Sequence, residues 1–315
     1  MKKLIFPLLL ISVFLFSEAF SYDNIKKDKK TIINSIESQK DRLIEISDNI
    51  WEAAEPALLE FKSSKYLSDY AEENGFRVTR GVAEIPTAFV AEFGSGKPVI
   101  GILGEFDANP GISQKKQPTK EPLVKGAAGH GCGHNLYGTG SLGAAIAIKE
   151  MIESGEISGT IRFYGTPAEE TIFAKVWMVR AGLFDDVDVC MDWHPSDEVE
   201  AATQSSKALV DFRLRFFGDA SHASGDPWNG NSAVDAMELY TTGLNYYREH
   251  VRPTARIHYD IEKAGDVVNV VPDFAQIWTR LRENDKENVN ILYERAKKIA
   301  EAASMMANVD YEMEL

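Results

Sequence analysis

The sequence predicts an α/β protein of two domains, and three observations support this. In the first two thirds of the chain, short apolar runs typical of buried strands alternate with helical patterns, which indicates a sheet with helices on both faces. Near Ala201–Ser206 the pattern changes to that of an alternating, half-exposed strand. From there the expected order is β-α-β-β-α-β, a small two-layer sandwich. We therefore expect one domain at residues 22–204 and a second at 205–315.

The first 21 residues have the features of a secretory signal peptide. Lys2 and Lys3 precede an apolar run from Leu4 to Phe16, which is shorter than the roughly 20 residues that a membrane span needs. Ala19-Phe20-Ser21 then fits a small-x-small cleavage site. We expect cleavage after residue 21 and export to the periplasm or the medium; the alternative is an uncleaved anchor.

Hydrophobic periodicity places the elements of both domains. In the first domain the expected helices are 31–54, Lys62–Asn74, Thr139–Glu153 and Thr171–Ala181. The expected strands there are Phe89–Phe93, Val99–Leu103, Thr160–Tyr164 and Val187–Trp193. In the second domain the expected strands are Lys207–Phe217, Ala255–Ile261, Phe274–Arg282 and Val309–Leu315, with helices at Ser232–Arg248 and Asn288–Ala303.

The net charge and the cysteine content argue against nucleic-acid binding and against a disulfide. The formal net charge of -14 argues against nucleic acid as a partner, because phosphate binding requires a basic surface. The chain has two cysteines, and we do not expect them to form a disulfide. Cys132 lies in a loop of glycines and histidines, whereas Cys190 lies in an apolar strand, where we expect it to be a small buried core residue.

The loop Gly129-His130-Gly131-Cys132-Gly133-His134-Asn135 is the best candidate for a metal site. Cys132 and His134 are two residues apart, so both side chains can reach one cation from a single turn. The small residues that follow predict a closely packed helix. The loop would then sit at a helix N-terminus, where we expect the dipole to lower the pKa of the Cys132 thiol.

Polar side chains directly follow the expected strands of the first domain. Because open α/β sheets bind ligands at the carboxyl ends of their strands, we expect these groups to converge. Together with the loop they offer the sulfur, nitrogen and oxygen ligands that suit zinc or a similar divalent ion. As a bare dipeptide, Glu169-Glu170 is more often an acidic pair at a helix N-terminus. The residues concerned are Glu105, Asp107, Glu169, Glu170 and His194.

This set of motifs resembles the M20 metallopeptidase/amidohydrolase family, most closely its aminoacylase-like branch that includes p-aminobenzoyl-glutamate hydrolases. The resemblance covers Ile32 to Leu315, and six motifs in the right order make it specific. The motifs are Gly104-Glu105-Phe106-Asp107, Gly129 to Asn135, Gly165 to Glu170, Asp192-Trp193-His194-Pro195, Ala220 to Ser224 and Val268 to Asp273. The resemblance implies a mixed-sheet catalytic domain with an inserted lid and dimerisation domain.

The resemblance also implies roles for individual residues. Glu169 would be the general base, and Asp107 would orient a ligand imidazole. In the lid domain, His222 would polarise the scissile carbonyl, in the family often from the partner subunit, and Asn269 would contact the substrate. Two zinc or manganese ions are implied, with Cys132 bridging them. The implied metal ligands are Cys132, His134, Glu170 and His194.

The sequence departs from the family pattern in two places. Glu105 stands where many relatives have a different residue. The sequence given ends at Leu315, whereas the family returns to the catalytic domain and supplies a final histidine ligand there. We expect either a fragment of a longer gene product or a truncated protein with an incomplete metal site.

The expected function is metal-dependent hydrolysis of an amide bond. The resemblance implies N-acyl or N-aroyl amino acids or small dipeptides as substrates, and a homodimer formed through the lid domain. The net charge predicts no nucleic-acid partner, and cleavage of the signal peptide would leave no membrane partner. Two alternatives stay open: a catalytically incomplete remnant that binds or dimerises, and a hydrolase in which Cys132 is a nucleophile paired with His134 or His194.

Overall fold

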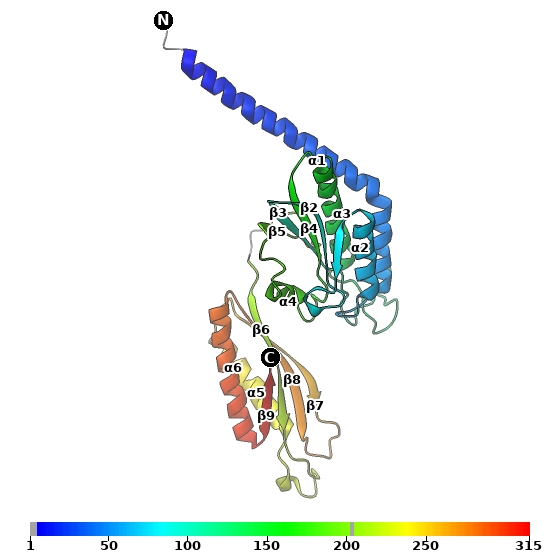
Figure 1. The fold of residues 1–315 in the computed structure, drawn as a ribbon. Coiled ribbons are helices and arrows are strands. Elements are labelled where there is room, and N and C mark those ends of the chain that lie inside the picture. The colour runs from blue at the N-terminus through cyan, green and yellow to red at the C-terminus, as the bar shows by residue number, and fades with distance from the viewer. Residues whose placement is uncertain (1–4, 202–204) are drawn as a thin grey trace. The chain divides into compact units, whose positions relative to one another are not determined.

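The structure is a computed structural model that describes residues 5–201 and 205–315 (Figure 1). The chain divides into two compact units, Met1–Val199 and Glu200–Leu315. Residues 1–4 of the expected signal peptide and the expected domain boundary at residue 204 lie outside the described residues. None of the helices in the described part combines the length and apolar character needed to cross a bilayer.

Five strands form a mixed sheet in the first unit, in the order β1-β2-β4-β3-β5. β3 is parallel to both β4 and β5, whereas β2 is antiparallel to β1 and β4. The central strand β4 is buried at six of its seven positions, as expected for a strand covered on both faces. The strands are β1 (Arg77–Arg80), β2 (Phe89–Ser95), β3 (Val99–Gly104), β4 (Gly159–Gly165) and β5 (Val189–Met191).

Helices cover this sheet unequally on its two faces. Phe163 of β4 packs in the larger core with side chains of the first three helices, whereas its neighbour Tyr164 packs in a smaller core with Ala174 and Met178. Because successive strand residues point to opposite faces, the two cores lie on opposite sides of the sheet. The helices are α1 (Ile5–Ala53), α2 (Phe61–Glu73), α3 (His134–Glu153) and α4 (Ala174–Arg180).

The expected mixed α/β architecture is confirmed, with three local differences. α1 is continuous from Ile5, whereas the periodicity predicted a helix only from residue 31. α4 begins at Ala174 rather than at Thr171. β1 was not predicted, because Arg77–Arg80 is short and largely exposed and carries no apolar run.

The prediction that Cys190 is a buried core residue is wrong. Cys190 is exposed and lies in the middle of β5, whose three residues are all exposed. β5 is the edge strand of the sheet and pairs only with β3 among the described strands. An apolar strand pattern predicts which residues can be buried, but the neighbours of the strand decide whether they are.

Close contact between α3 and the end of β3 depends on a glycine. A Cβ atom at Gly138 would lie 2.5 Å from the backbone oxygen of Glu105, so any larger residue would push the helix away. His134, one turn before Gly138 on the same helix, is thereby held against the residues that follow β3. The small-residue helix expected from the sequence therefore brings the metal-binding loop to the strand ends.

The second unit is a four-stranded antiparallel sheet, in the order β7-β8-β6-β9, with two helices. Phe212, Leu214 and Phe216 alternate along β6 and pack with both helices in one core. The observed order is the expected β-α-β-β-α-β. The elements are β6 (Ala208–Phe217), α5 (Ala233–Arg248), β7 (Arg256–Ala264), β8 (Phe274–Glu283), α6 (Lys286–Ala307) and β9 (Asp310–Glu314).

Candidate metal centre

The candidate site lies at the carboxyl edge of the parallel strands β3, β4 and β5. These strands are neighbours and point the same way, so the segments that follow them emerge at the same edge of the sheet. α3 begins at this edge with His134, directly after Gly133, whose left-handed backbone (φ 74°) caps the helix. The residues that follow are Glu105 and Asp107 after β3, Glu169 and Glu170 after β4, and His194 after β5.

Two groups of possible metal ligands share His134. The ligand atoms of Cys132, His134 and His194 lie within 4.8 Å of one another. The ligand atoms of Glu105, His134 and Glu169 also lie within 4.8 Å of one another. Side chains from the loop and from the strand ends therefore converge as expected, Glu105 among them.

His134 is completely buried and held by Asp107. Its Nδ1 lies 3.0 Å from Asp107 Oδ1 and 3.1 Å from the Asp107 backbone oxygen. Nδ1 therefore donates its proton to Asp107, and Nε2 carries the lone pair. Burial by itself lowers the pKa of His134, but Asp107, Glu170 and Glu169 together raise it above its usual value.

Three buried atoms around His134 have no hydrogen-bond partner among the described residues: His134 Nε2, Glu105 Oε2 and Glu170 Oε1. Nε2 lies 2.9 Å from Glu105 Oε2 and 3.8 Å from Glu170 Oε1. Two ligands of a tetrahedral zinc ion, each about 2.1 Å from the metal, are about 3.4 Å apart. Since buried polar atoms are normally paired, three orphaned atoms at this spacing fit a divalent cation.

The Cys132 thiol does not have the lowered pKa that its place near a helix N-terminus predicted. Burial and the neighbouring Glu170 carboxylate raise the pKa of Cys132 to about 11. Asn109 orders this part of the loop, since its Oδ1 accepts the backbone N–H groups of Gly131 and Cys132. No motif in the sequence predicted this role for Asn109.

Asp107 also connects His134 to the glutamate pair. The Glu170 backbone N–H donates to Asp107 Oδ2 over 2.9 Å, while Oδ1 faces the imidazole. α4 begins four residues after Glu170 and has no acidic residue in its first turn, so the pair does not serve as a helix N-terminal acid pair. Burial, and next the Glu170 carboxylate, raise the pKa of Glu169.

His194 completes the cluster from an exposed position. Its ring is perpendicular to that of His134, at an interplanar angle of 89° and a centroid distance of 5.5 Å. Its Nδ1 lies 2.9 Å from the backbone oxygen of Pro195, so Nε2 is the nitrogen available to a ligand.

The two candidate substrate residues lie in the second unit, next to one another. His222 forms an isolated antiparallel bridge with Val270, and the Ala223 N–H donates to the backbone oxygen of Asn269 over 3.0 Å. Both His222 and Asn269 are exposed. The ring nitrogen Nδ1 of His222 accepts the Gly225 N–H over 3.0 Å, so Nε2 is the nitrogen available to a ligand.

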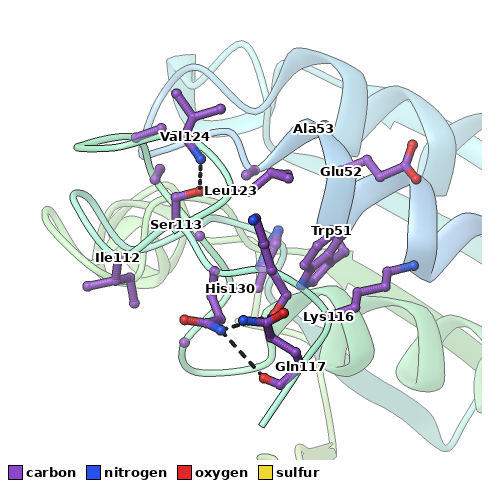
Figure 2. Close-up of a pocket in the computed structure, with 17 residues that line it drawn as sticks. Trp51, Glu52, Ala53, Ile112, Ser113, Lys116, Gln117, Leu123, Val124 and His130 are labelled. Atoms are coloured by element: carbon purple, nitrogen blue, oxygen red, sulfur yellow. Dashed lines mark hydrogen bonds between the residues drawn. The ribbon is translucent and has the colours of Figure 1, made fainter. Parts of the chain in front are cut away.

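A cavity of about 560 Å³ adjoins the loop that leads into Cys132 (Figure 2). Its walls are the end of α1, the segments 112–117 and 123–124, and residues 127–131. Lys116 Nζ lies 4.9 Å from the centre of the Trp51 ring. His130 Nε2 lies 3.1 Å from the Ile50 backbone oxygen, and burial lowers the pKa of His130 to about 4, so this imidazole is neutral near pH 7.

Comparisons with known proteins agree on one family. Residues 101–313 match the profile of peptidase family M20/M25/M40. The chain is 43% identical over 285 residues to one of the subunits of p-aminobenzoyl-glutamate hydrolase of Escherichia coli, covering 89% of this chain and 59% of that protein. It is 29% identical to the Xaa-Arg dipeptidase of Mus musculus, covering 91% of this chain and 65% of that protein. The chain thus spans about three fifths of the length of these curated relatives.

Solved structures show the same fold. An aminobenzoyl-glutamate utilization protein from Klebsiella pneumoniae superimposes with a TM-score of 0.68 at 19% identity, covering 90% of this chain and 77% of that one. The Bacillus subtilis YXEP protein, described as a dinuclear metal-binding peptidase, gives a TM-score of 0.63 at 22% identity, covering 88% and 74%.

Proposed function

The chain belongs to peptidase family M20/M25/M40, and from this premise we propose that it is a metal-dependent hydrolase of amide bonds. The proposed substrates are N-acyl or N-aroyl amino acids or small dipeptides. The names of the relatives support this class, since one is named as part of a p-aminobenzoyl-glutamate hydrolase and another as a dipeptidase.

The observation that supports the proposal best is the convergence of His134 Nε2, Glu105 Oε2 and Glu170 Oε1 without hydrogen-bond partners among the described residues. Cys132, His134, Glu170 and His194 would hold two zinc or manganese ions. When bound, such an ion acts as a Lewis acid that polarises a carbonyl oxygen and acidifies water.

Residues of each unit have chemistry that the proposed reaction needs. Asp107 keeps His134 in the tautomer that presents Nε2. Glu169, whose pKa is raised by burial and by Glu170, takes a proton from the attacking water and returns it to the leaving amine. His222 polarises the scissile carbonyl and Asn269 contacts the substrate. The raised pKa of Cys132 argues against that thiol as the nucleophile.

We further propose that the second unit forms a homodimer. The sheet ends in the edge strands β7 and β9, which offer unpaired backbone groups to another chain. Two relatives in E. coli are named as different subunits of p-aminobenzoyl-glutamate hydrolase, so a related second chain is the competing partner. Analytical ultracentrifugation of the purified chain tests the homodimer. A dimer of identical chains supports the proposal, and a monomer contradicts it.

Export is a separate proposal that depends on the N-terminal residues alone. The basic residues, apolar run and small-x-small site support cleavage after residue 21. N-terminal sequencing of the protein recovered from the periplasm or medium should start at Tyr22. Full-length protein confined to the cytoplasm would contradict the proposal.

Metal content tests the proposed activity most directly. We expect one or two zinc or manganese ions per purified chain by elemental mass spectrometry. Cys132→Ala should lose metal, while Cys190→Ala, at the exposed cysteine of β5, should retain it. Hydrolysis of p-aminobenzoyl-glutamate should follow metal content across these variants and stop on chelation. A folded chain without metal, or full metal in Cys132→Ala, would overturn the assignment.

A further inference from the structure

The connection between α1 and α2 touches both strand-end segments of the metal centre. The backbone oxygen of Glu55 accepts the Ala108 N–H over 2.9 Å, next to Asp107. The Glu55 carboxylate accepts the Ser63 N–H over 2.9 Å and so caps the start of α2. Leu58 within this connection has a left-handed backbone with a φ of 62°. The connection is therefore tied at both ends.

Glu60 at the end of this connection is a fully buried carboxylate. Its exposed fraction is 0%, and the donors to its two oxygens, the Ala168 N–H and the Thr87 hydroxyl, are both uncharged. Its Oε1 accepts the Ala168 N–H over 2.9 Å, and its Oε2 accepts the Thr87 hydroxyl over 3.1 Å. Burying a carboxyl group without a cationic partner costs free energy even when it keeps its proton, so the hydrogen bonds to Ala168 and Thr87 are the contacts that hold it in place.

Ala168 is the residue directly before the glutamate pair, and its backbone is strained. It is completely buried and has a φ of 57°, in the left-handed region that residues with a Cβ rarely adopt. Glu60 holds the N–H of Ala168, and Asp107 holds the N–H of Glu170. Two buried carboxylates from different parts of the chain thus bind the backbone on either side of Glu169.

We infer that Glu60 is a positioning residue for Glu169, acting through Ala168. Its hydrogen bond keeps Ala168 in the left-handed conformation that directs Glu169 and Glu170 towards His134. The described hydrogen bonds of the Glu60 side chain go to Thr87 and Ala168 and to no proposed metal ligand. The expected effect of Glu60 on catalysis rests on the proposed function. Its effect on the backbone at Ala168 does not depend on that function.

The first test compares variants of Glu60 with a matched control. Glu60→Ala removes the acceptor for Ala168, Glu60→Gln keeps an acceptor of the same length, and Thr87→Val removes only the other hydrogen bond. We expect at least a tenfold lower kcat for Glu60→Ala with less than a twofold change in KM. Glu60→Gln and Thr87→Val should stay within threefold of the unsubstituted chain.

A second variant separates positioning from loss of stability. Glycine adopts a left-handed φ without strain, so Ala168→Gly should restore most of the kcat lost in Glu60→Ala. Should the double variant stay as slow as the single one, or should kcat fall in proportion to Tm in both Glu60→Ala and Thr87→Val, the positioning role is wrong. If Glu60→Ala does not fold, Glu60→Leu takes its place beside the same glycine rescue.

Hydrogen exchange gives a readout that does not depend on catalysis. In Glu60→Ala the segment 166–172 should lose protection in exchange mass spectrometry, whereas in Thr87→Val it should not. Unchanged protection in Glu60→Ala would overturn the inference even if kcat fell. If the unsubstituted chain hydrolyses no amide while the exchange result holds, the proposed function fails and the role of Glu60 in ordering the turn survives.

Discussion

The carboxylate of Asp107 lies 3.0 Å from His134 Nδ1 through one oxygen and accepts the Glu170 N–H over 2.9 Å through the other. One side chain thus sets the tautomer of a proposed metal ligand and the position of the glutamate pair. His134 is the first residue of α3, and Glu170 lies in the segment after β4. Asp107 therefore links the start of α3 to the segment that carries the glutamate pair.

Replacing Asp107 by asparagine should weaken metal binding. An amide that presents its NH₂ group to Nδ1 favours the wrong tautomer of His134, and loss of such partners typically costs 10- to 100-fold in metal affinity, on the order of 10-fold or more here. A competition titration with a chromogenic zinc chelator measures the change. Asp211→Asn, which alters an ion pair with Arg280 in the second unit, is the matched control and should bind zinc as the unsubstituted chain does.

Glu169 and Glu170 should respond differently to replacement by alanine. Glu169→Ala should lower kcat by roughly 10²- to 10⁴-fold, the contribution usual for a general base, and keep its metal. Glu170→Ala should lose metal, because its orphaned Oε1 faces His134 Nε2. Elemental mass spectrometry beside steady-state kinetics measures both. Loss of metal from Glu169→Ala would show that the two roles are assigned the wrong way round.

Gly138→Ala should destabilise the first unit although alanine favours helix. The added Cβ would lie 2.5 Å from the Glu105 backbone oxygen, and overpacking of this kind costs about 1–3 kcal/mol. Gly143→Ala is the control on the same helix, because the nearest atom to its Cβ is a terminal methyl of Leu43 at 2.8 Å, which can move, rather than a backbone atom. We expect that control to be neutral or stabilised by up to about 1 kcal/mol. Urea unfolding measures the stability of both variants. Equal stability would mean that the contact between position 138 and the Glu105 backbone oxygen is not tight.

Glu60 should make stability fall as pH rises. Burial raises the pKa of Glu60 from 4.5 to about 7, so between these values the folded chain keeps a proton that the unfolded chain releases. The free energy of unfolding therefore decreases from pH 4.5 to pH 7, by on the order of 3 kcal/mol. Glu60→Gln should lack this decrease and Thr87→Val should retain it. Urea unfolding at pH 5 and pH 8 checks the sign.

Much of this site is visible in local patterns. Apolar runs and helical periodicity predicted the order of the elements in both units, apart from β1. The spacing of Cys132 and His134, and the carboxylates after β3 and β4, predicted a mixed cluster at one edge of the sheet. Each of these motifs spans only a few neighbouring residues. Because open α/β sheets bind ligands at the carboxyl ends of their strands, the motifs also predict where in the fold the site lies.

The sequence alone determined the family, the order of strands and helices and the residue types of the proposed metal centre, because local periodicity and motif spacing carry that information. Only the tertiary structure decided the exposure of Cys190, the raised pKa of Cys132 and the part played by Glu60. These properties depend on which groups from distant segments surround a side chain. Glu60 and Ala168 are 108 residues apart, and their hydrogen bond exists only because the sheet brings their segments together.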